Sequence, residues 1–122
     1  MNINELFGVS GKVAIVTGGS RGIGEMIASG FLANGVKVYI TARKEGPLIE
    51  KAEELSKKYN GNCIPIACDL SSTVGTNYFV EKIIKHEKGI DFLVNNAGAA
   101  WGEPYKKFSE SGWDKVMDLN VK

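Results

Sequence analysis

A glycine-rich segment near the N-terminus has the residue types that a phosphate-binding turn requires. It comprises Thr17, Gly18, Gly19, Ser20, Arg21, Gly22, Ile23 and Gly24. The segment follows the apolar run 13–16 and precedes a helical pattern. Glycines let the backbone turn tightly and approach a ligand, and the next helix directs free N–H groups and its positive dipole end at an anion. This order predicts a site for the pyrophosphate of a dinucleotide.

The glycine spacing alone leaves a second interpretation open. It reads T-G-x-x-x-G-x-G, not the commoner G-x-G-x-x-G, and a tight strand-to-helix turn can also be purely structural. Two further segments favour the ligand-binding interpretation. The sequence Asn95-Asn96-Ala97-Gly98 follows the strand-like residues 91–94, and Asn120 lies within residues 113–121.

With these three segments in this order, the chain resembles the short-chain dehydrogenase/reductase family. The resemblance runs from about Gly11 to the last residue. Residues 95–121 look most similar to the 3-oxoacyl-acyl-carrier-protein reductase type, in particular the branch linked to rhamnolipid synthesis. The resemblance implies a Rossmann-type doubly wound α/β fold and NADP(H)-dependent reduction of a ketone or 3-oxoacyl thioester to an alcohol. It also implies a homo-oligomer, a dimer or tetramer, when the protein is complete.

The resemblance assigns roles to residues after the third and fourth predicted strands. In the family an acid at the position of Asp69, next to Leu70, contacts the adenine; taken alone, Asp69 is also compatible with a turn or helix-capping aspartate. Asn95 matches a residue that ties neighbouring strands together. Asn96 and Ala97 would line the ribose side of the cofactor.

Two more residues carry expectations from the family. Gly98 would let the backbone approach the cofactor closely. Asn120 matches the catalytic asparagine, whose backbone helps to hold a water in a proton relay; alternatively it kinks or caps a helix.

The charge after the second predicted strand indicates which cofactor binds. A ribose 2′-hydroxyl is recognised by an acid about 20 residues after the glycines, and a 2′-phosphate by a cation. The chain has Arg43 and Lys44 there, with no acid before Glu45. Arg43 offers a charge-assisted fork to the phosphate and Arg21 a second cation, which favours NADP(H). In the alternative, Arg43 and Lys44 form a solvated basic patch.

Strands and helices alternate along the chain. Strands are expected at 12–16, 37–41, 63–68 and 91–94, and helices at 22–34, 47–59, 73–87 and from about 109. Apolar residues recur at helical spacing: Ile23, Ile27 and Phe31 in the first helix, and Tyr78, Phe79, Ile83 and Ile84, expected to face the sheet, in the third. Right-handed crossovers then give a parallel sheet of strand order 3-2-1-4.

A carbonyl reductase also needs an acid that protonates the developing alkoxide. In the family this acid is the tyrosine of Y-x-x-x-K, which follows the asparagine together with an upstream serine in the order serine, tyrosine, lysine. This chain ends two residues after Asn120. Tyr78 and Lys82 have the spacing but precede the fourth strand, so we do not expect them to be catalytic. Residues 1–122 are therefore expected to be the NADP-binding half of a single Rossmann domain, an N-terminal fragment of a longer enzyme.

Composition limits the partners. The chain has 122 residues, 43% of them hydrophobic, and a net charge of +1, which gives no reason to expect nucleic acid or an anionic membrane. No apolar run approaches the roughly 20 residues of a membrane span, and the N-terminus lacks a secretion signal, so a cytoplasmic protein is expected. The spacing of Cys63, Cys68 and the single His86 predicts no metal site. The expected partner is a small-molecule carbonyl substrate, either free or acyl-carrier-bound.

Two other functions remain open at this point. The chain could be a free-standing nucleotide-binding or regulatory module without catalysis. It could also be a pseudoenzyme that assembles with a full-length paralogue through the exposed edge of residues 91–94.

Overall fold

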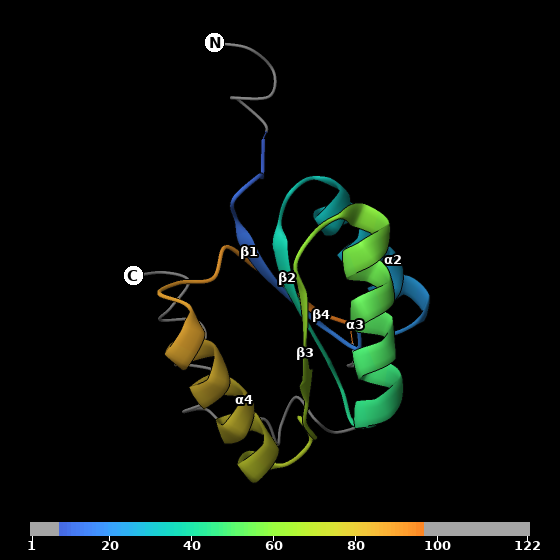
Figure 1. Ribbon diagram of the computed structural model, residues 1–122. Coiled ribbons are helices and arrows are strands. Elements are labelled where there is room, and N and C mark those ends of the chain that lie inside the picture. The colour runs from blue at the N-terminus through green and yellow to red at the C-terminus, as the bar shows by residue number, and fades with distance from the viewer. Residues whose placement is uncertain (1–7, 97–122) are drawn as a thin grey trace.

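Figure 1 shows the computed structural model of the chain, which describes residues 8–96. These residues form a parallel sheet with the order β3-β2-β1-β4, which confirms the predicted fold class and strand order. The strands are β1 (Val13–Thr17), β2 (Lys37–Ala42), β3 (Cys63–Ala67) and β4 (Phe92–Asn95). The helices are α2 (Gly22–Ala33), α3 (Glu45–Tyr59) and α4 (Thr73–His86).

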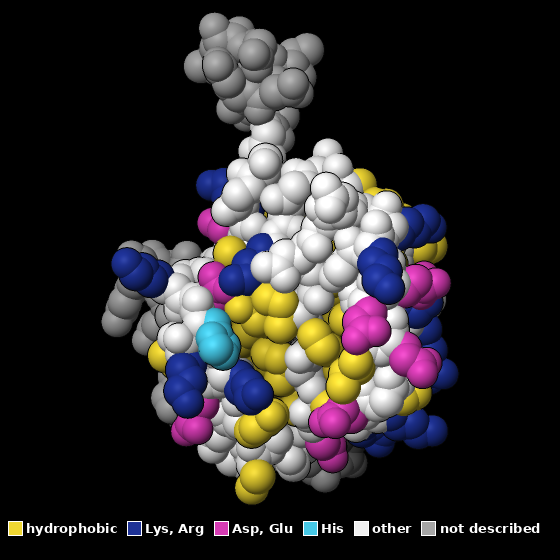
Figure 2. All heavy atoms as spheres, in the orientation of Figure 1, with side chains coloured by type: hydrophobic (Ala, Val, Ile, Leu, Met, Phe, Trp, Pro, Cys, Tyr) yellow, Lys and Arg dark blue, Asp and Glu magenta, His cyan; other side chains and the backbone are white. Residues whose placement is uncertain are grey.

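The helices cover both faces of the sheet, and each face has its own apolar core. Helices α2 and α3 lie on one face and α4 on the other, as Figure 1 shows. Because side chains alternate along a strand, Ala14 and Val16 of β1 face α2 and α3, while Ile15 faces α4. The strands are thereby buried on both sides, as is usual for parallel sheets. On the face seen in Figure 2, charged side chains gather toward both sides and apolar ones lie between them.

Local signals fix where the helices begin and end. The Ser72 hydroxyl accepts a hydrogen bond from the Gly75 N–H (2.9 Å) and caps the start of α4. Asn60 adopts a left-handed conformation (φ 48°) and ends α3, and Gly35 (φ 80°) follows α2. Helix α3 starts at Glu45, two residues before the expected Pro47, which nevertheless lies in the first turn.

The apolar pattern of two helices was only partly assigned correctly. In α2 the buried residues are Gly24, Ala28 and Leu32, while Ile23 is 67% exposed. In α4 Phe79 and Ile83 are buried, but their neighbours Tyr78 and Ile84 point outward, contrary to expectation. Adjacent helical residues differ by about 100° in direction, so one member of each apolar pair must leave the core.

Candidate cofactor-binding site

The carboxyl ends of β1 and β4 are tied together side by side. Thr17 pairs in register with Asn95. The Thr17 hydroxyl donates to the Val94 carbonyl oxygen (3.3 Å) and toward Asn95 Oδ1 (3.1 Å). Asn95 thus joins neighbouring strands, the role that the sequence predicted for it. The glycine turn after β1 and the loop after β4 consequently start from the same point of the sheet, where open α/β sheets bind ligands.

The glycine turn has a backbone that only glycines accommodate well. Gly18 (φ 68°) and Gly22 (φ 62°) both lie in the left-handed region. The Gly18 N–H donates to the Thr41 carbonyl oxygen (3.0 Å), which fixes the start of the turn against β2. A Cβ on Gly19 would lie 2.5 Å from Ile40 Cγ2, so the turn is also pressed onto the sheet.

The outer side of this turn is open toward the first turn of α2. A Cβ on Gly22 would meet no atom within 4 Å, and Gly22 itself is exposed. Arg21 occupies the N-cap position with an extended backbone, and its side chain makes no capping hydrogen bond. The first N–H groups of α2 lack partners within the helix, and a Cβ at Gly22 would meet no atom, which suits the pyrophosphate of a dinucleotide. The residues present fit such a group.

Asn96 lies against the same turn from the β4 side. Its amide Nδ2 donates to the Gly18 carbonyl oxygen, at a distance of 3.4 Å. The sequence predicted Asn96 as a residue that lines the ribose, and the structure adds a contact with the turn that sequence reasoning missed.

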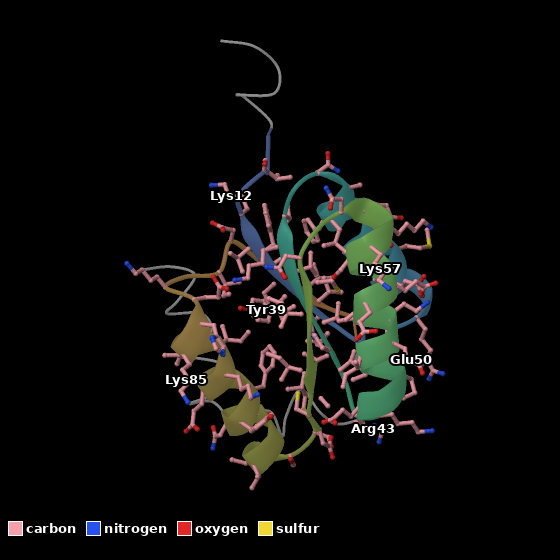
Figure 3. The ribbon with its side chains drawn as sticks, viewed as in Figure 1. Lys12, Tyr39, Arg43, Glu50, Lys57 and Lys85 are labelled. Carbon is pink, nitrogen blue, oxygen red and sulfur yellow. The ribbon has the colours of Figure 1, made fainter. Side chains whose placement is uncertain are left out.

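Arg43 and Asp69 lie at the carboxyl ends of β2 and β3, which are neighbouring strands. Both are exposed, and Figure 3 shows Arg43 at the end of the sheet opposite Lys12. Asp69 Oδ1 accepts hydrogen bonds from the Ser71 hydroxyl (2.6 Å) and the Ser71 N–H (3.0 Å). These bonds, and to a lesser degree the positive charge of Arg43, hold the pKa of Asp69 below its ordinary value. Arg43 is thus close enough for its positive charge to act on the carboxylate of Asp69.

The local geometry of Asp69 is that of a turn residue, as one of the two sequence interpretations expected. Its carboxylate closes the turn before α4, while Ser72 caps the helix. The Leu70 side chain is buried in the core on the α4 side, so Leu70 can offer a ligand only its backbone.

Other candidate residues lie on other surfaces or outside the described part. Tyr78 and Lys82 occur on α4, with Lys82 Nζ 5.4 Å from the centre of the exposed Tyr78 ring. Ala97, Gly98 and Asn120 lie outside the described residues.

Cys63 and Cys68 are free thiols, and burial raises the pKa of each to about 12. Within residues 8–96 no group of three potential metal ligands occurs, and no helix there is long and apolar enough to cross a membrane.

Comparison with known proteins identifies the family. The family model described as short chain dehydrogenase matches residues 12–122, which is most of the chain. The chain belongs to the short-chain dehydrogenase family. The glycine turn and β4 both lie within the matched residues.

Proteins similar to this chain include reductases whose structures contain NADP or NADPH. The rhamnolipids biosynthesis 3-oxoacyl-acyl-carrier-protein reductase of Pseudomonas aeruginosa is 44% identical over 115 residues, covering 94% of this chain and 44% of the relative. The Pseudomonas aeruginosa RhlG/NADP active-site complex superposes with a TM-score of 0.73 at 34% identity, covering 94% of this chain and 47% of the other. L-Sorbose reductase from Gluconobacter frateurii, complexed with NADPH and L-sorbose, has a TM-score of 0.77 at 31% identity, covering 93% and 48%. The chain spans less than half the length of these relatives.

Proposed function

We propose that the complete protein to which this chain belongs is an NADP(H)-dependent reductase that converts a ketone or a 3-oxoacyl thioester to an alcohol. Residues 1–122 would be the NADP-binding half of its Rossmann domain. Membership of an oxidoreductase family and the NADP complexes among similar structures support this proposal. The resemblance to a 3-oxoacyl-acyl-carrier-protein reductase supports an acyl thioester as substrate, carrier-bound in that relative's name.

The observation that carries the proposal is the open glycine turn combined with Arg43 after β2. The N–H groups at the start of α2 would hold the pyrophosphate, with Gly22 leaving the space that it needs. Arg43, exposed at the end of β2, would bind the 2′-phosphate through a charge-assisted pair of hydrogen bonds. Arg21, exposed in the turn, would add a second positive charge.

The remaining proposed contacts complete the cofactor side of the site. Asp69 with the backbone of Leu70 would lie near the adenine, and Asn96, Ala97 and Gly98 near the ribose. Bound NADPH supplies a hydride to the carbonyl carbon. The chain's residues would bind and orient the cofactor, and the backbone of Asn120 would help to hold a water of the proton relay. The protonating tyrosine and its lysine, which the family resemblance implies, would lie beyond Lys122.

The test uses the complete protein purified with its natural sequence. NADPH oxidation is followed by absorbance with a 3-oxoacyl thioester and with simple ketones, and NADH serves as the matched cofactor. We expect oxidation of NADPH with at least one carbonyl compound and a clear preference over NADH. Failure to bind either dinucleotide would overturn the proposal, and binding without turnover of any carbonyl compound would instead favour a binding or regulatory module.

A further inference from the structure

The contact between Asn96 and Gly18 joins two parts of the site that are 78 residues apart in the sequence. Asn96 directly follows β4, and Gly18 opens the turn after β1. The amide Nδ2 of Asn96 donates to the Gly18 carbonyl oxygen at 3.4 Å. This distance is at the long end for a hydrogen bond, so its effect is expected to be moderate.

Gly24, in the first turn of α2, packs directly against this contact. A Cβ on Gly24 would overlap the Gly18 carbonyl oxygen and lie 2.6 Å from Asn96 Nδ2. Gly24 is buried, and it is not among the glycines with positive φ. The chain therefore needs glycine at this position for space, because the helix packs directly on the hydrogen-bonded pair.

The hydrogen bond fixes the orientation of the peptide between Gly18 and Gly19. In a trans peptide the carbonyl oxygen and the N–H point in opposite directions. Because the Gly18 oxygen is turned to Asn96, the Gly19 N–H points away from it. A flipped peptide would turn the Gly18 carbonyl oxygen to the side where the Gly19 N–H now points. A carbonyl oxygen on that side would repel the phosphate oxygens of a dinucleotide. Gly18 (φ 68°) carries no Cβ, so its own backbone leaves such a flip sterically open.

We propose that Asn96 is a positioning residue that holds the glycine turn in the form that accepts pyrophosphate, by donating to the Gly18 carbonyl. This inference rests on the proposed dinucleotide-binding function. Asn96 acts here through the turn, which is a role beyond lining the ribose. Loss of this hydrogen bond should therefore weaken the binding of NADPH and NADH alike. Both contain the pyrophosphate, and only NADPH carries the 2′-phosphate.

The test compares two isosteric changes in the complete protein. Asn96→Asp replaces the donating amide by a carboxylate oxygen that faces the Gly18 carbonyl. Asn95→Asp places the same charge one residue away but keeps the oxygen that accepts from Thr17. It therefore controls for the added negative charge near an anionic ligand. Dissociation constants are measured by fluorescence titration with NADPH, NADH and adenosine 2′-phosphate, which lacks the pyrophosphate.

We expect Asn96→Asp to weaken NADPH and NADH equally, by about tenfold more than Asn95→Asp does, as loss of one hydrogen bond and a new repulsion predict. Adenosine 2′-phosphate should bind both variants alike, which a general loss of structure would not allow. If Asn96→Asp does not fold, Asn96→Ala provides the same comparison without a charge.

Two outcomes separate this inference from the proposed function. Equal dinucleotide affinity of the folded Asn96 and Asn95 variants would overturn the role of Asn96, while binding by the natural protein would leave the proposed function intact. Absence of dinucleotide binding by the natural protein would overturn both.

Discussion

At the residue scale, the glycines of α2 have different physical reasons for being glycine. Gly24 is enclosed by the Gly18 carbonyl oxygen and the Asn96 amide, whereas a Cβ on Gly30 would meet nothing within 4 Å. Glycine in a helix interior costs stability relative to alanine. At Gly24 the structure compensates for that cost, because the helix backbone packs closely against the Gly18 peptide and the Asn96 side chain.

The two positions form a matched pair of substitutions. Gly24→Ala should destabilise the fold by about 1–3 kcal/mol, because an added methyl group has no space, and should weaken NADPH binding. Gly30→Ala should stabilise the fold by up to about 1 kcal/mol through helix propensity and leave binding unchanged. Urea unfolding and cofactor titration of both variants measure these effects. Equal stability of the two variants would contradict the packing assigned to Gly24.

At the element scale, α4 is anchored to β2 by a small polar cluster away from the candidate cofactor-binding site. The buried Tyr39, labelled in Figure 3, donates to Glu87 Oε2 at 2.5 Å, and Lys37 Nζ lies 2.5 Å from the same oxygen. Glu87 is the C-cap residue of α4 and Lys37 begins β2. Burial alone would raise the pKa of Glu87, but the hydrogen bonds from Lys37 and Tyr39 outweigh it and lower that pKa.

This anchor predicts a loss of stability in acid. A carboxylate whose pKa is lowered by folding stabilises the fold above its ordinary value of 4.5, and this contribution disappears as pH falls through the lower pKa of the folded state. In Glu87→Gln the unfolding free energy should therefore be lower than in the natural protein at neutral pH, and the difference should shrink in acid. Urea unfolding across this pH range measures it.

A second change in the cluster serves as its control. Tyr39→Phe keeps the ring in the core and removes only the hydrogen bond to Glu87, at a cost of about 1.5–3 kcal/mol, typical of a bond to a charged group. A difference between Glu87→Gln and the natural protein that does not change with pH would show that Glu87 is not the titrating group.

At the scale of the whole molecule, the polar cluster around Glu87 and the residues proposed to bind the cofactor lie at opposite ends of one sheet. The glycine turn, Asn96 and Arg43 follow the carboxyl ends of the strands, while Lys37 begins β2 at the other end. Among the described residues β4 is an edge of the sheet, and the side chains of Phe92, Leu93 and Val94 are half-buried. The described residues therefore form a sheet that carries the proposed cofactor site at one end and an edge at β4 that can accept further structure.

The sequence was sufficient to predict this sheet because the signals for its strands are local. Glycine punctuation and apolar runs located every strand to within one or two residues, and crossover handedness gave their order. It was insufficient where contacts join distant segments. Neither the Asn96–Gly18 bond nor the Tyr39–Glu87 bond has a sequence signature. The exposure of Ile23 likewise depends on how α2 sits on the sheet, which periodicity alone does not specify.

The central claim is that the glycine turn binds a dinucleotide whose 2′-phosphate is held by Arg43. The most direct measurement is the pair of dissociation constants for NADPH and NADH in the complete protein, its Arg43→Asp variant and a Lys44→Asp variant. Lys44→Asp makes the same charge change one residue along the chain. We predict that Arg43→Asp weakens NADPH by about tenfold or more, equivalent to ~1.5–3 kcal/mol, without weakening NADH, and that Lys44→Asp changes the ratio much less. An unchanged NADPH-to-NADH ratio in Arg43→Asp would contradict the account.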